Sequence, residues 1–209
     1  MSLELSLKMT VPGPSLKSTH RILSIDPGTN HLGYAISEVY LMDPYEPMEV
    51  IEVDTLQPGN LAKPFTTLIE VHGEKVAKLY ALEQAIKRIL ERFKPDIIVS
   101  ESPYMGQFPQ AYAALVECLK SIRSALIDFD PCKPLNSIDP ATIKASVGVS
   151  GKSGDKNLMS TAIKKLIDEK KLILPCNLSE LDEHSIDAIA VGYAYLFPKV
   201  PVKKSRTKH

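Results

Sequence analysis

The 209 residues suit one compact domain, and a hydrophobic fraction of 44% is enough to build its core. The 25 acidic and 25 basic residues balance, whereas a duplex-binding protein usually has a basic excess, so the charge argues mildly against nucleic acid. Three widely spaced cysteines without a CxxC pair predict neither a disulfide framework nor a zinc knuckle, and no apolar run approaches the roughly 18 residues of a membrane span.

The two ends of the chain differ in composition from its middle. Residues 1–20 contain Pro12 and Pro14 and lack the cationic start and apolar stretch of a signal peptide, so they are predicted to form a flexible leader. Residues 199–209 are predicted to form a basic tail. Residues 21–198 are expected to be one domain of a cytoplasmic protein without a membrane segment.

The first half of the domain is predicted to contain three strands and a long helix. Short apolar runs bounded by turn formers indicate the strands, and aliphatic residues at helical spacing indicate the helix. The predicted ranges are 21–26, 33–39 and 50–56 for the strands, 57–64 for a loop and 66–93 for the helix.

The second half is predicted to alternate between strands and helices. The ranges are 96–101 and 134–138 for strands, 107–129, 141–147, 156–170 and 181–197 for helices, and 148–154 for a glycine-rich loop. This order predicts an α/β domain in which helices flank a mixed five-stranded sheet.

Three acidic residues are candidates for a metal site. Asp26 and Glu101 end predicted buried strands, at the sheet edge where α/β proteins bind ligands. Asp187 lies among apolar residues of the last helix, where an unpaired buried charge is costly. Glu183 is the alternative to Asp187, and Asp182 is predicted to cap the helix. Carboxylates brought close together repel one another, and divalent cations that favour oxygen ligands remove this conflict.

Each of these residues also has an ordinary structural explanation. An acid at a strand end often caps a helix or forms a turn, and a lone histidine on a helix is usually structural. His184 precedes Asp187 by three residues and shares its helical face. Because histidine titrates near neutral pH, His184 would be able to orient or deprotonate water. The metal-site hypothesis therefore depends on the constellation more than on any single residue.

Four segments resemble, in family order, the motifs of the RuvC-type Holliday junction resolvases, which belong to the RNase H-like superfamily. They are ILSIDPGTNHLGYAI, PDIIVSESPYM, ATIKASVGVSGKSGDKNLMSTAIKKL and DEHSIDAIAVGYAY. The resemblance covers residues 22–195. No motif is specific alone, and the order and spacing of all four carry the resemblance.

The resemblance implies an RNase H-like fold and a catalytic metal site. Asp26, Glu101 and Asp187 would be ligands of two Mg²⁺ or Mn²⁺ ions, and His184 would be a further ligand or a proton-transfer group. The implied activity is that of a crossover junction endodeoxyribonuclease, which hydrolyses phosphodiester bonds in Holliday junctions or other branched DNA.

The resemblance also implies contacts with DNA and a second subunit. Tyr104 would stack on a base, and Lys144 and Lys156 would contact phosphates, with Lys152 as the alternative because the glycine loop is longer than in the family. A four-way junction is two-fold symmetric, so a homodimer is expected. The helix at 107–129 would either supply the interface or simply pack on the sheet. A bacterial or bacteriophage member, associated with the nucleoid, is expected.

Two other functions remain as alternatives. The segment SIDPGTNHLGYAI also resembles the first phosphate-binding hairpin of actin-like and sugar-kinase ATPases, but a second such hairpin is missing from the sequence. The other alternative is an RNase H-like DNA-binding module without activity, against which the three acids argue. A P-loop at Gly151-Lys152-Ser153 is rejected because Ser146 stands where the motif needs glycine.

Overall fold

A mixed six-stranded sheet, formed by the described residues, is the centre of the fold, with strand order β5-β4-β1-β2-β3-β6. The computed structural model describes residues 19–40, 46–105, 108–149 and 157–199. The strands are β1 (Thr19–Asp26), β2 (Leu32–Tyr40), β3 (Met48–Leu56), β4 (Ile97–Glu101), β5 (Leu135–Ile138) and β6 (Leu172–Ile173). The helices are α1 (Pro58–Ala62), α2 (Thr66–His72), α3 (Glu74–Phe93), α4 (Pro109–Phe129), α5 (Pro140–Val147), α6 (Asn157–Asp168) and α7 (Glu183–Leu196), with a 3-10 turn at Leu178–Glu180.

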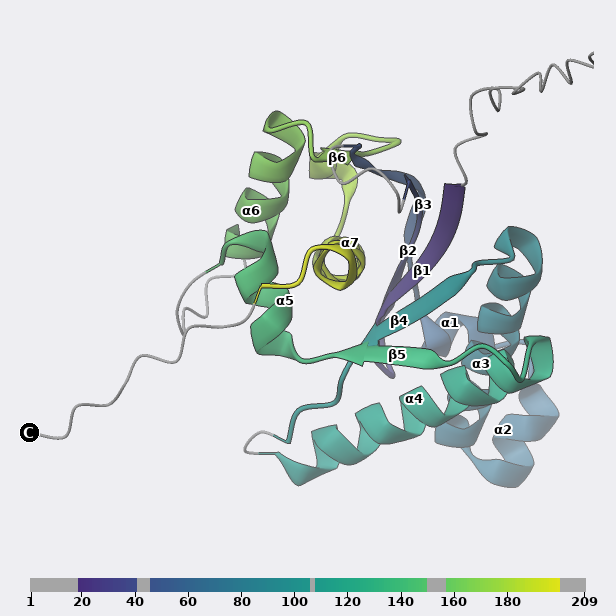
Figure 1. The fold of residues 1–209 in the computed structure, drawn as a ribbon. Coiled ribbons are helices and arrows are strands. Elements are labelled where there is room, and N and C mark those ends of the chain that lie inside the picture. The colour runs from purple at the N-terminus through teal and green to yellow at the C-terminus, as the bar shows by residue number, and fades with distance from the viewer. Residues whose placement is uncertain (1–18, 41–45, 106–107, 150–156, 200–209) are drawn as a thin grey trace, which may run out of the picture.

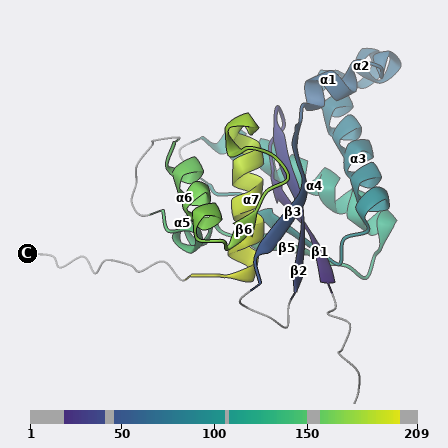
Figure 2. The same cartoon turned by 90° about the horizontal axis from the view of Figure 1, so that it is seen from above.

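Helices cover both faces of the sheet (Figures 1 and 2). One apolar cluster lies between the sheet and α5, α6 and α7, and a second lies between the sheet and α3 and α4. Residues of β1 alternate between the two clusters: Ile22 joins the first, and Leu23 and Ile25 join the second. This alternation follows from the two-residue period of a strand. The predicted α/β class, with helices on both sides of a mixed sheet, is confirmed.

The sheet topology brings the ends of two distant strands to one edge. β1 pairs parallel with β4, and Ile25 lies opposite Ser100. The next residues, Asp26 and Glu101, therefore leave the sheet side by side. Alternate residues of a strand face the same side of the sheet, and Ile22 and Val99 belong to the first cluster. Asp26 and Glu101 lie an even number of residues from them, so both face the side of the sheet that α7 covers.

Helix α7 crosses the sheet at close range. Its buried residues, from Ala188 to Val191 and including Ala194, belong to the first cluster. A Cβ atom on Gly192 would lie 2.9 Å from the Ser24 Oγ, so glycine permits this approach to β1.

The prediction of a single helix at 66–93 is wrong, because this range contains two helices. Gly73, with φ at +84°, separates α2 from α3, because an isolated glycine can end a helix in a left-handed conformation. The loop predicted at 57–64 contains the short helix α1, which begins with Pro58 in its first turn.

The sheet has one strand more than the five predicted. β6 has only two residues and pairs parallel with the start of β3, too short a run for a periodic pattern to reveal. β1 begins at Thr19, so the last two residues of the expected leader belong to the sheet. Residues 1–18 and 200–209, with most of the expected leader and tail, lie outside the described residues. None of the described helices has the length and hydropathy needed to cross a membrane.

Candidate active site

The three predicted acids meet in one cavity. Asp26, Glu101 and Asp187 line a space of about 200 Å³. Two strand ends supply the first two side chains, and α7 supplies the third from above the sheet. Lys144 of α5 joins the lining, as do Pro140, Ile143 and Met159. Segments that lie more than 70 residues apart in the sequence are therefore neighbours in the fold.

Burial of the three acids makes their ionisation unfavourable. Burial, together with the nearby charges of Asp26 and Asp187, raises the pKa of Glu101 to about 7 against the opposing charge of Lys144. Burial and the charge of Asp26 likewise raise the pKa of Asp187 to about 6. The pKa of Asp26 is also raised, mainly by burial, although the hydrogen bond with His184 lowers it. This charge conflict is the one expected of carboxylates gathered without a cation.

His184 contacts the first of these acids directly. Its Nδ1 lies 3.0 Å from Asp26 Oδ2, so an Nδ1–H donates to the carboxylate when that carboxylate is ionised. Its Nε2 lies 3.9 Å from Glu183 Oε1. Glu183 itself is exposed and does not line the cavity, so Asp187 and not Glu183 is the acid of α7 that points into it.

The donor set suits a hard divalent cation, but it is not preassembled. Carboxylate oxygens are the ligands that Mg²⁺ and Mn²⁺ favour, and three of them line one small cavity. Among the residues that the structure describes, no three His, Cys, Asp or Glu side chains are arranged as a ready-made metal site. A cation would have to draw the carboxylates closer together.

The first turn of α7 is fixed against the sheet by residues that the sequence reasoning anticipated only in part. The side chain of Asp182 accepts a hydrogen bond from the Ser185 N–H at 2.8 Å, which confirms the predicted helix cap. Thr55 at the end of β3 donates to Asp182 at 2.7 Å. A Cβ atom on Gly33 would lie only 2.0 Å from the His184 carbonyl oxygen. Asp182 and Gly33, the latter in the Gly-Tyr pair of the first motif, carried a signal in the sequence, whereas Thr55 did not.

The predicted DNA-contacting residues have different outcomes. Tyr104, directly after β4, has 72% of its surface exposed, and Lys144 lies in the cavity wall. Lys152 and Lys156 lie outside the described residues. Two large apolar residues that follow Tyr104 in the sequence, Met105 and Phe108, are also exposed, which the sequence reasoning did not anticipate.

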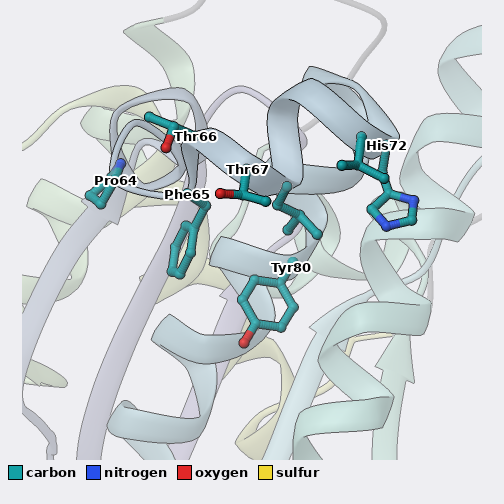
Figure 3. A pocket seen from close by; sticks show the side chains of 8 residues that line it. Pro64, Phe65, Thr66, Thr67, His72 and Tyr80 are labelled. Carbon is teal, nitrogen blue, oxygen red and sulfur yellow. The ribbon is translucent and has the colours of Figure 1, made fainter.

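A second hollow lies far from the acids, on the α2 side of the molecule (Figure 3). It has a volume of about 510 Å³, and Phe65 meets Tyr80 edge to face within it at 5.2 Å between ring centroids. Threonines, apolar residues and His72 complete the lining, and no acid takes part. This composition gives it no cluster of carboxylate ligands for a divalent cation, so the carboxylate cavity remains the candidate active site.

Comparison with known protein sequences identifies two relatives that are both crossover junction endodeoxyribonucleases. No family model matches the chain. The crossover junction endodeoxyribonuclease RuvC of Cytophaga hutchinsonii is 26% identical over 187 residues, which are 88% of this chain and 80% of that protein. RuvC of Campylobacter hominis is 26% identical over 177 residues, which are 84% and 96% of the two chains.

Solved structures agree with these relatives at the level of the fold. Thermus thermophilus RuvC, in complex with a Holliday junction substrate, matches with a TM-score of 0.61 at 15% identity, over 85% of this chain and 93% of that one. The yeast mitochondrial Holliday junction resolvase matches with a TM-score of 0.57 at 14% identity, over 85% and 78%. The ATPase alternative is not favoured, since both sequence relatives are endodeoxyribonucleases. The chain is therefore a relative of the RuvC-type resolvases and has their RNase H-like fold.

Proposed function

We propose that the chain is a metal-dependent endonuclease that resolves Holliday junctions or other branched DNA by hydrolysing phosphodiester bonds. The observation that carries the proposal is the convergence of Asp26, Glu101 and Asp187 in one cavity, in a chain related to crossover junction endodeoxyribonucleases. The raised pKa values of these acids support it, because the cavity favours added positive charge.

Different residues in and beside the cavity would bind the metal ions, act on the attacking water and contact the phosphate. Asp26, at the end of β1, is placed between the other two elements and would hold both of two Mg²⁺ or Mn²⁺ ions, with Glu101 and Asp187 holding one each. When bound, these ions would activate the attacking water and neutralise the departing 3′ oxygen. His184, held by Asp26 through Nδ1, would orient that water or take its proton. Lys144 would offset the charge of a phosphate that enters the cavity.

Affinity for DNA would come from residues around the cavity. The exposed ring of Tyr104 would stack on a base that is unpaired at the branch point. Lys144, with Lys156 or Lys152, would contact phosphates without regard to sequence, so binding would weaken as salt rises. The balanced charge of the whole chain is compatible with this, because the acids of a metal site lower the net charge.

Two coordinated incisions in a symmetric junction call for a homodimer. Helix α4 packs on the sheet and on α3 through residues such as Cys118, Leu119 and Ile122. Its opposite side carries Val116 and Ile127, both exposed, which would be able to contact a second subunit. Packing on the sheet and dimerisation therefore use different sides of the same helix. An enzyme of this kind would act at the nucleoid of a bacterial or phage-infected cell.

The test is cleavage of a synthetic four-way junction whose strands are labelled one at a time. We expect paired, symmetric nicks with Mg²⁺ or Mn²⁺, none with EDTA and none in linear duplex. Asp26→Asn should abolish nicking and retain junction binding, whereas Asp168→Asn, an exposed change on α6, should behave as the wild type. Tight binding without nicks would favour the inactive module, and ATP turnover without nicks would favour the ATPase. Either result would overturn the proposal.

A further inference from the structure

Two imidazole rings are stacked next to Asp26, one of the acids of the carboxylate cavity. The ring centroids of His31 and His184 are 5.2 Å apart, and their planes differ by only 10°. His31 lies in the turn between β1 and β2 and is exposed. Parallel ring stacking of this kind is favourable and orients both rings. The resemblance to the resolvases assigns His31 no role.

Close backbone contacts fix the positions of the main-chain atoms that carry the two imidazole side chains. A Cβ atom on Gly28 would lie 2.0 Å from the His31 carbonyl oxygen, so the turn after Asp26 folds tightly back on itself. On the other side, the Gly33 backbone lies against the His184 carbonyl, as described above. The thiol of Cys118 on α4 approaches the Gly28 carbonyl oxygen at 3.7 Å, which ties the turn to the second core cluster. The stacked pair is therefore built on rigid supports from β1, β2 and α7.

The two contacts on His184 restrain different motions of its ring. The hydrogen bond from Nδ1 to Asp26 holds one edge of the ring and selects the tautomer in which Nε2 carries the lone pair. The His184 ring, held only by this hydrogen bond, would still be able to tilt about it. The His31 ring stacked on the His184 ring restricts this tilt and so keeps the direction of Nε2 constant.

We propose that His31 is a positioning residue for His184: its ring holds the His184 imidazole in the orientation in which Nδ1 meets Asp26 and Nε2 lies on the side of Glu183. The part of His184 in cleavage rests on the proposed function, while the orientation of the ring does not. A histidine that touched only solvent would have no such effect.

The test compares His31→Ala with His31→Phe, which keeps a flat ring, and with His72→Ala, which removes an exposed histidine of the distant α2 hollow. The first readout is the long-range ¹H–¹⁵N spectrum of the His184 ring in metal-free protein at alkaline pH, where histidine is neutral. His184→Asn assigns the signals. We expect the Nδ1-protonated pattern in the wild type, in His31→Phe and in His72→Ala, and a mixture of tautomers in His31→Ala.

The second readout is single-turnover cleavage of the four-way junction. His31→Ala should lower the rate about three- to tenfold, the effect of losing one stacked ring pair, with junction affinity unchanged. His31→Phe should restore most of the rate. Thermal melts of His31→Ala and His31→Phe should stay close to that of the wild type, because His31 is exposed.

Two results would overturn the inference. One is an unchanged His184 spectrum in His31→Ala, and the other is a His31→Phe variant whose spectrum matches that of His31→Ala. Failure of the wild type to cut a junction is a separate outcome, because it removes the proposed function and leaves the spectra to decide the role of His31.

Discussion

The substitution Glu101→Gln should stabilise the metal-free protein at neutral and alkaline pH while it abolishes cleavage. Glutamine keeps the shape of a protonated glutamate and cannot ionise. In the fold, the pKa of Glu101 is raised from 4.5 to about 7 by burial and by Asp26 and Asp187. A carboxyl group with a raised pKa holds its proton more tightly in the folded state than in the unfolded state. Stability therefore falls as pH rises from 4.5 to about 7.

The size of this effect follows from the two pKa values. The difference between 4.5 and about 7 corresponds to about 3 kcal/mol once both states are ionised. At pH 8 in EDTA, Glu101→Gln should thus exceed the wild type by about 3 kcal/mol in its free energy of unfolding. At pH 4, where the glutamate is largely protonated in both states, the advantage should be within about 0.5 kcal/mol.

Urea denaturation at both pH values measures the difference. The control is Glu91→Gln, an exposed change on α3, which should alter stability by at most about 0.5 kcal/mol at either pH. Excess Mn²⁺ should stabilise the wild type, by about 2.7 kcal/mol at a hundred times its Kd, and Glu101→Gln much less. The reasoning is refuted if Glu101→Gln gains nothing at pH 8, or gains equally at pH 4.

Substitutions at three further positions test how the site is assembled. Gly33→Ala should destabilise the fold by about 2 kcal/mol or more and abolish cleavage, because its Cβ would collide with the His184 carbonyl oxygen; a wild-type melting curve would contradict this. Asp182→Ala removes the cap of α7 and should cost about 1 kcal/mol in urea denaturation, whereas Asp182→Asn should recover much of it. Lys144→Ala should weaken junction binding alike for different sequences and reduce the salt slope by about 1; an unchanged slope would exclude a phosphate contact.

Strand ends and their acids were predictable because their physical signals are local. Apolar runs closed by an acid and a turn former marked Asp26 and Glu101, and an acid among apolar residues marked Asp187. Parallel pairing of β1 with β4 then places the first two at one edge, which the α/β pattern alone anticipates. The cap at Asp182 followed from its position before the last helical run.

Other features depend on contacts that no local pattern records. The two-residue strand β6 exists only because its neighbour β3 offers an edge. The break at Gly73 could not be told from a tolerated glycine inside a helix. The hydrogen bond from Thr55 to Asp182 joins residues 127 positions apart, and the stacking of His31 on His184 joins two histidines that look unrelated in the sequence. Such pairs become visible only once the chain is folded.

Anomalous diffraction from crystals soaked in Mn²⁺ tests the central claim most directly. The account predicts manganese peaks bounded by the carboxyl groups of Asp26, Glu101 and Asp187, at metal–oxygen distances of about 2.2 Å, and the loss of those peaks in Asp26→Asn. A cavity without manganese, at a concentration that supports junction cleavage in solution, would contradict the account.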